Sequence, residues 1–528
     1  MKNATCLLCG AAALMLIVGA SSAVKAQSTI ELPVDATTSY KGEEFLLIGD
    51  AVRGSGEPVI VVSPKNPNII LVGAMANLHY VEGAPLGGPE ERISVEARVK
   101  YRNTPGSSIS TYAISHDRGR TWKFFNDPFR DHFKMNGTAD AFVGAGKDGT
   151  LFIGAMNFFP LNATPEMLEQ EKEPRPGLLY GATDISWSTD DGKTWSTPTH
   201  VMGQFNKQED YAPGVKPVFL GKTPYDRPFV ITDMSTGSIY IPGSGTGGDP
   251  PHGELFFRAT RDNGKTWSPI YTSDSLDYPG SGGRPVAANG VVAVAYNATS
   301  VPASAGATCP CLVFGLSRDQ GKTFDRHVVT LPGDTPVAGA TAGAAGGRGG
   351  AAAGGPPAGA AGGRGGGGFG GGGISLAADQ SHAGRFALRK TAAGNTQMLV
   401  WVTDDYGKTW KGPALAGTVP GTTMSKADMA YSPKGELALM WLAVTPSGTY
   451  TAWSSVSHDG GAKFSAPVQV SHSPSPARNS IKYRGNNWDG DDLSSIVADN
   501  DYVHMVWADG RAGFLASWYA RIPLSSYQ

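Results

Sequence analysis

The chain has 528 residues, of which 40% are hydrophobic, and its formal net charge is -2. A nearly neutral chain has no electrostatic footprint for nucleic acid or for an anionic membrane surface, so neither partner is expected. Only Cys309 and Cys311 lie beyond the first 26 residues. A disulfide framework is therefore excluded as the main source of stability, which must come from a large hydrophobic core.

Residues 1–26 have the pattern of a cleavable export signal. A lysine at position 2 precedes an apolar run from Leu7 to Gly19, and small residues lead to Val24, Lys25 and Ala26. We therefore expect a secreted or periplasmic protein made of one domain, residues 27–528. No later apolar run approaches the ~18 residues that span a bilayer, so no membrane association is expected after cleavage.

A short motif recurs six times along the chain. The copies are SHDRGRTW (115–122), STDDGKTW (188–195), TRDNGKTW (260–267), SRDQGKTF (317–324), TDDYGKTW (403–410) and the degraded SHDGGAKF (457–464). Repetition at a similar spacing is typical of arrays and propellers, in which each repeat forms one structural unit. Six copies also argue against a catalytic role for Ser115, His116 and Asp117, because that reading would need six active sites.

Each copy follows a strand-like run and precedes another, which places it at a hairpin turn. We expect six structural aspartates whose side chains accept hydrogen bonds from turn amides: Asp117, Asp190, Asp262, Asp319, Asp405 and Asp459. The glycine of each copy permits a positive φ, and the threonine supplies a second side-chain bond. The final Trp or Phe is then placed to pack between neighbouring sheets.

These repeats resemble the Asp-box, or bacterial neuraminidase, repeats of sialidase-like β-propellers, and they cover nearly all of the chain after residue 26. The resemblance implies an all-β fold of four-stranded antiparallel blades. It also implies a superfamily that contains sialidases, other glycosidases, polysaccharide lyases and noncatalytic binding propellers. Function must therefore be argued from the site.

The number of strand-like runs predicts seven blades, with six as the alternative. Three runs without a repeat follow the sixth copy, at 493–499, 502–509 and 514–522, and the run at 43–50 supplies their fourth strand and closes the ring. In the fifth unit the runs are 384–390 and 397–403, with 374–379 nearby. The segment from about 338 to 373, rich in Gly and Ala, predicts a disordered surface insert. Cys309 and Cys311 form either a local disulfide or two free thiols.

In a propeller blade the repeat turns lie on one face, so a site is expected on the other, where the innermost strands begin. Charged residues cluster near those positions. The catalytic candidates are Glu57, Asp140 and Asp226, and the substrate-binding candidates are Arg53, Arg227, Arg284, His382, Arg385, Asp428, Arg484 and Asp489.

Three chemistries are open for this set. A pair of carboxyl groups suits a glycoside hydrolase, and arginines suit the carboxylate of an anionic sugar. The first innermost strand reads GSGEPVIVV, with Gly56 where the sialidase family places an arginine, which favours a noncatalytic glycan- or protein-binding propeller as the alternative. A polysaccharide lyase would use His382 or Tyr211 as base with Arg284. No cofactor is expected, although the acidic run 489–492 could hold a structural calcium ion.

Overall fold

The computed structural model describes residues 29–31, 43–49, 53–78, 108–133, 137–159, 180–203, 206–215, 227–247, 252–273, 275, 277–280, 284–334, 374–476 and 493–528. The expected export signal (1–26) and the Gly/Ala-rich insert (338–373) lie outside these residues. None of the described helices is long and apolar enough to cross a membrane.

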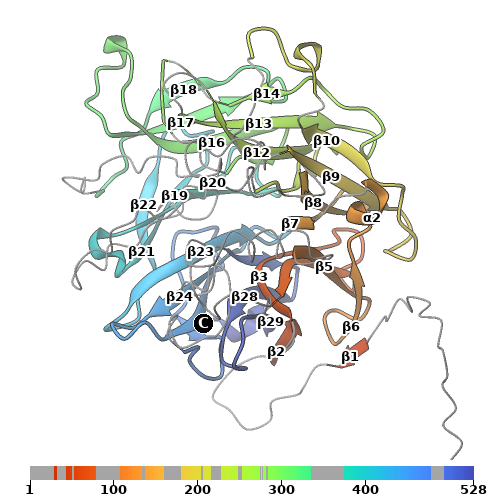
Figure 1. Cartoon of the computed structure of the whole chain (residues 1–528). Coiled ribbons are helices and arrows are strands. Elements are labelled where there is room, and N and C mark those ends of the chain that lie inside the picture. The colour runs from red at the N-terminus through yellow and green to blue at the C-terminus, as the bar shows by residue number, and fades with distance from the viewer. Residues whose placement is uncertain are drawn as a thin grey trace, which may run out of the picture.

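Seven antiparallel sheets, blades 1 to 7, follow one another around a ring (Figure 1). From the innermost strand outward, blade 1 contains β3 (Arg53–Val62), β4 (Ile70–Leu78), β5 (Ser108–Ser115) and β6 (Thr121–Asn126), with β1 (Thr29–Glu31) added at the outer edge. Blade 2 contains β7 (Gly137–Ala145), β8 (Leu151–Phe159), β9 (Tyr180–Ser188) and β10 (Thr199–Gly203). Blade 3 contains β11 (Ile231–Thr232), β12 (Ile239–Gly247), β13 (His252–Thr260) and β14 (Tyr271–Thr272).

The remaining blades repeat the same order. Blade 4 contains β15 (Val286–Ala288), β16 (Val291–Ala298), β17 (Cys311–Ser317) and β18 (Asp325–Val328). Blade 5 contains β19 (Ile374–Ala378), β20 (Phe386–Thr391), β21 (Met398–Thr403) and β22 (Lys411–Gly417). Blade 6 contains β23 (Thr423–Tyr431), β24 (Leu437–Val444), β25 (Tyr450–Ser457) and β26 (Val468–Gln469). Blade 7 contains β27 (Ser494–Ala498), β28 (Tyr502–Asp509), β29 (Ala516–Pro523) and β2 (Glu43–Ile48).

The seven-bladed prediction is confirmed, and so is ring closure by an N-terminal strand. Strand β2 pairs with β29 in antiparallel register, with Glu43 opposite Arg521. The join is also held by charge, because Arg511 lies 2.5 Å from Glu44 and 2.7 Å from Asp509. The outermost strand of blade 7 is thus drawn from the opposite end of the chain, which leaves no open edge between the first and last blades.

Burial follows the position of a strand within its blade. The second strand of blade 6, LALMWLAV, is buried along nearly its whole length because other blades cover both of its faces, whereas most of the outermost strand of blade 5, KGPALAG, is exposed. The core therefore lies between blades. Four tryptophans are among its largest fully buried side chains: Trp122, Trp401, Trp441 and Trp507.

The six repeats form hairpin turns with the predicted hydrogen bonds. In the first, Ser115 donates to Asp117 Oδ1 (2.8 Å) and accepts from the Gly119 amide (2.7 Å), while Thr121 donates its amide to Oδ1 (2.8 Å) and its hydroxyl to Oδ2 (2.6 Å). The second to fifth copies repeat these contacts. The sixth has Lys463 in place of the threonine and retains the amide bond to Asp459.

The aromatic residue that ends a repeat packs against the preceding blade. The ring of Trp122 lies 5.0 Å from that of Tyr519 in blade 7, and the ring of Trp410 lies 5.6 Å from that of Phe314 in blade 4. The repeats therefore join blades as well as strands, as the sequence predicts.

Blade 5 corrects one detail of the prediction. Its innermost strand is β19 (Ile374–Ala378), and the run 384–390 contains the second strand, β20. Both runs are short and contain apolar residues, so the sequence alone did not separate the innermost strand from its neighbour. In blade 4, Cys309 and Cys311 form a disulfide.

Candidate functional site in the central pocket

A small pocket, open to solvent, lies where the innermost strands begin. Five of its lining segments belong to different blades and supply Val59, Phe229, Arg284, Asp428 and Leu493. Strands β19, β23 and β27 add the rest of the lining: Ser375, Leu376, Lys426, Ala427, Ser494 and Ser495. The repeat turns lie at the far ends of the blades, so the pocket is on the face opposite to them.

A repeated irregularity shapes the inner strands near this pocket. The register shifts between Gly56 and Val59 in β3, between Ala139 and Phe142 in β7, and between Ser425 and Asp428 in β23. Each of these bulges contains a charged residue with positive φ, and a fourth such residue precedes β11: Glu57 (52°), Asp140 (46°), Lys426 (49°) and Arg227 (54°). A left-handed backbone is strained for such residues, and strain of this kind concentrates at functional sites.

Arg284 is one of two cations that line this pocket, the other being Lys426. Its guanidinium carbon lies 4.2 Å from the centre of the Phe229 ring, so the aromatic face fixes the position of the charge. With the described residues Arg284 makes no hydrogen bond or ion pair. Burial lowers its pKa, and the charge of Asp428 partly opposes that shift. Its fork of N–H donors therefore remains available to an anion.

Asp428 is the carboxyl group of the pocket wall. Its Oδ2 accepts a hydrogen bond from the backbone N–H of Ile496 at 3.2 Å. Burial raises the pKa of Asp428, and the positive charges of Arg284 and Arg389 oppose this rise only in part. Asp428 is thus easier to protonate than an exposed aspartate.

Two cations of this site were missed by the sequence reading, Arg389 and Lys426. Arg389 lies in β20 opposite Ser375, is 4% exposed, and donates from Nε to Ser375 Oγ at 2.9 Å. Burial lowers its pKa to about 10. The signal in the sequence was an arginine inside the apolar run FALRK, which stays ambiguous until the order of the strands in blade 5 is known. Lys426 lies two residues before Asp428 and gave no separate signal.

The predicted catalytic carboxylates Glu57 and Asp140 occupy the same bulge position in neighbouring blades. Their residues are 1% and 5% exposed, respectively. Asp140 Oδ2 accepts the backbone N–H of Arg227 at 3.1 Å, which brings Arg227 to the same region. Val59, two residues after Glu57, and Phe229, two residues after Arg227, line the pocket itself.

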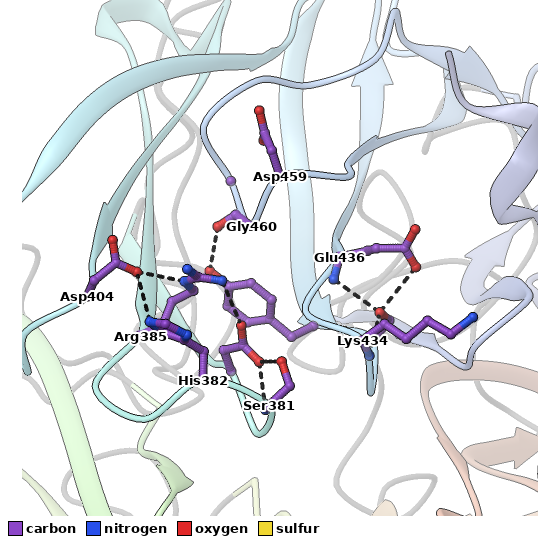
Figure 2. Close-up of polar contacts among 12 residues, drawn as sticks. Ser381, His382, Arg385, Asp404, Lys434, Glu436, Asp459 and Gly460 are labelled. Atoms are coloured by element: carbon purple, nitrogen blue, oxygen red, sulfur yellow. Dashed lines mark hydrogen bonds and ion pairs between the residues drawn. The ribbon is translucent and has the colours of Figure 1, made fainter.

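His382 and Arg385 lie elsewhere, in the turn between β19 and β20 on the face that carries the repeat turns (Figure 2). Arg385 Nε contacts Asp404 at 2.7 Å, its Nη1 lies 3.3 Å from Asp379, and His382 lies 3.7 Å from Asp404. The revised strand order of blade 5 accounts for this placement. These residues join blade elements and are not brought to the central pocket.

The other predicted residues are only partly described. Arg53 begins β3, but its side chain lies outside the described residues. Asp226, Arg484 and Asp489 lie outside them entirely, as does the acidic run 489–492. Tyr211, the alternative lyase base, is buried in the core beside Phe256, with ring centres 6.4 Å apart. In the described part of the chain, no group of three or more His, Cys, Asp or Glu side chains is arranged to hold a metal ion.

On the turn face, one side chain spans three blades around the ring axis. Gln380 of blade 5 donates from Nε2 to the carbonyl oxygens of Thr232 (3.1 Å) and Ala287 (2.7 Å), and its Oε1 accepts the amide of Met234 (3.1 Å). A ligand is therefore expected to enter from the opposite face.

The ring of seven antiparallel sheets, each with four strands apart from the additional β1 in blade 1, defines the chain as a β-propeller. No family model and no curated protein matches it. Solved structures similar to it include a protein of unknown function from Dyadobacter fermentans (13% identity, covering 91% of this chain and 98% of that one, TM-score 0.47) and a Hadza microbial sialidase (14%, 92% and 96%, 0.42). An α-L-arabinanase from Penicillium chrysogenum, complexed with arabinobiose, is also similar (13%, 74% and 94%, 0.37). At these identities and TM-scores the activities of those proteins do not extend to this chain.

Proposed function

We propose that this protein is an exported, carbohydrate-active propeller that binds an acidic saccharide in its central pocket and hydrolyses a glycosidic bond there. The observation that carries the proposal is Arg284, a half-buried guanidinium in the pocket whose donors are not used by the described residues. A planar fork of donors matches the two oxygens of a carboxylate.

The rest of the lining supports a sugar rather than a simple anion. Val59, Phe229 and Leu493 offer an apolar surface for the C–H face of a ring, and Ser375, Ser494 and Ser495 carry hydroxyl groups suited to sugar hydroxyls. Apolar and polar side chains thus line the pocket together, as a sugar with C–H faces and hydroxyl groups requires. Arg389 and Lys426 add positive charge beside it.

For the reaction we assign Glu57 and Asp140 as the pair of carboxyl groups. Glycoside hydrolysis needs one protonated and one ionised carboxyl group on opposite sides of the bond. The two residues are equivalent in neighbouring blades, and Val59, two residues after Glu57, lines the pocket. The same burial favours a second candidate, a noncatalytic glycan-binding propeller, because side chains only 1% and 5% exposed need a local opening before they reach substrate.

The test is a product-release assay with sialosides, uronic-acid polysaccharides and neutral glycans. We expect turnover of an acidic glycan by the wild-type protein, a loss of at least ~100-fold in Asp140→Asn and Glu57→Gln, and a similar loss in Arg284→Ala. The control is Arg120→Ala, which removes an exposed arginine on the turn face and should keep full activity.

The outcomes separate the candidates. Full activity in Arg284→Ala would contradict the placement of the site. Binding of an acidic glycan without turnover would establish the binding module instead, and binding of none of the glycans would contradict both.

A further inference from the structure

Two side chains of opposite charge, those of Arg284 and Asp428, line the pocket without contacting each other. Arg284 and Asp428 both line the cavity, yet neither an ion pair nor a hydrogen bond joins them. Each still acts on the charge of the other, as their opposing effects on pKa indicate. The space between these two side chains is part of the pocket, which is open to solvent. It lies beside the face of the Phe229 ring on which Arg284 is stacked.

An anionic ligand that binds to Arg284 must approach Asp428. We propose that an acidic saccharide binds between Arg284 and Asp428 with uptake of one proton from solvent by Asp428, whose carboxyl group thereby changes from a competing anion into a hydrogen-bond donor. This inference rests on the proposed function, because it assumes a carboxylated ligand. No bond of the protein is made or broken apart from the new O–H bond.

The surroundings of Asp428 support this coupling. The charged groups that act on it are Arg284 before β15 and Arg389 on β20, and Lys426 on its own strand lines the same pocket. The adjoining strands β19, β24 and β27 contain no titratable side chain, since they read ISLAA, LALMWLAV and SSIVA. Asp428 is therefore a described carboxyl group whose negative charge acts on the half-buried Arg284 and the buried Arg389. A bound ligand carboxylate would supply negative charge at the same place, and two carboxylates this close do not both stay ionised without a free-energy cost.

The backbone holds the Asp428 carboxyl group in place. Its Oδ2 accepts the amide of Ile496, and the amide of Met429 also favours the ionised form. When protonated, the carboxyl group presents an O–H to the ligand.

Calorimetric titration with D-glucuronate, in two buffers of different ionisation enthalpy, measures the protons taken up per ligand bound. For the wild-type protein we expect close to one, with affinity that rises about tenfold per pH unit as pH falls between the pKa values of Asp428 in the bound and free states. Asp428→Asn has an amide donor in the position of the protonated acid. It should bind at neutral pH at least as tightly as wild type and take up no proton.

Asp325→Asn, at an exposed position of β18, is the matched control and should behave as wild type. Equal proton uptake in Asp428→Asn and wild type would overturn the inference, and so would binding tenfold weaker in Asp428→Asn than in wild type.

A second measurement separates this inference from the proposed function. If D-glucuronate binds no better than D-glucose, the proposed function is contradicted. The coupling itself is then tested without ligand, by following the Asp428 carboxyl carbon with NMR during a pH titration. Its pKa should rise in Arg284→Ala relative to wild type, and an unchanged pKa would overturn the inference.

Discussion

Nε of Arg118 lies 2.9 Å from Oδ2 of Asp499, which joins the first repeat turn to the β27–β28 turn of blade 7. Asp499 Oδ2 also lies 3.1 Å from Nε2 of the fully buried His504. Burial alone would raise the pKa of Asp499, but the hydrogen bond from His504 and those from the backbone amides of Asp501 and Tyr502 together lower it. The two ends of the ring are thus linked by a nearly buried carboxylate in addition to β2.

Asp499→Asn should lower the free energy of unfolding by about 3 kcal/mol, because it leaves buried partners of a charged network unmatched. Urea denaturation of the wild-type and variant proteins measures this. Asp325→Asn should change stability by less than about 0.5 kcal/mol, as expected for an exposed position. Equal stability of all three proteins would show that Asp499 does not hold the ring.

Gly119→Ala should be strongly destabilising. Gly119 has φ of +83°, and a Cβ there would lie 2.1 Å from the hydroxyl oxygen of Tyr519 in blade 7. We expect the free energy of unfolding to fall by more than about 3 kcal/mol, because backbone strain and an overpacked contact between blades add together. Thermal and urea unfolding both measure it.

Gly306→Ala separates these two costs, since Gly306 also has positive φ (+62°) but open space around its Cβ position. The Gly306→Ala substitution should lower the free energy of unfolding by about 1 kcal/mol. Similar losses at both glycines would mean that the contact with Tyr519 has no effect on stability.

The repeat turns should make stability dependent on acid pH. Hydrogen bonds from the Thr194 side chain and amide lower the pKa of Asp190 to about 2, and at Asp405 the bonds from Thr409 outweigh burial and reach the same value. A folded pKa below the unfolded value means that this stabilisation is complete above about pH 4 and is lost as pH falls toward 2.

Unfolding free energy measured between pH 2 and pH 5 checks this dependence. In Asp405→Asn the slope against pH should decrease by almost one proton, with lower stability at pH 7. A slope equal to that of wild type would contradict the role of Asp405 as an ionised acceptor in the folded state.

Phe229→Leu tests whether the aromatic ring positions Arg284. Loss of the cation–π contact should weaken the binding of D-glucuronate by about 5-fold, while binding of a neutral sugar changes less. Arg284→Lys should also bind the acid more weakly, because a point charge does not match both carboxylate oxygens. Calorimetry at fixed pH and salt measures both variants. Equal weakening for acidic and neutral sugars would mean that Phe229 acts only through packing.

Much of the candidate site could be read from charged residues near expected strand starts. Arg284 and Asp428 were selected in this way, and both line the pocket. Arg389 was missed and Arg385 was chosen, because two strand-like runs, ISLAA and FALRKT, compete for the innermost place in blade 5. Which arginine meets the pocket depends on strand order, and hydrophobicity alone does not encode that order.

The sequence by itself determined the class of architecture. Six copies of one turn motif, each with an acceptor, a glycine and an aromatic residue, imply repeated hairpins that pack blade on blade, since those interactions are local or between nearest neighbours. Only the tertiary structure decided that Arg511 pairs with Glu44 where the ring closes, and that Arg389 rather than Arg385 contacts the pocket residue Ser375. Such contacts depend on the angle, register and order of all seven sheets together, and no local pattern of residues specifies them.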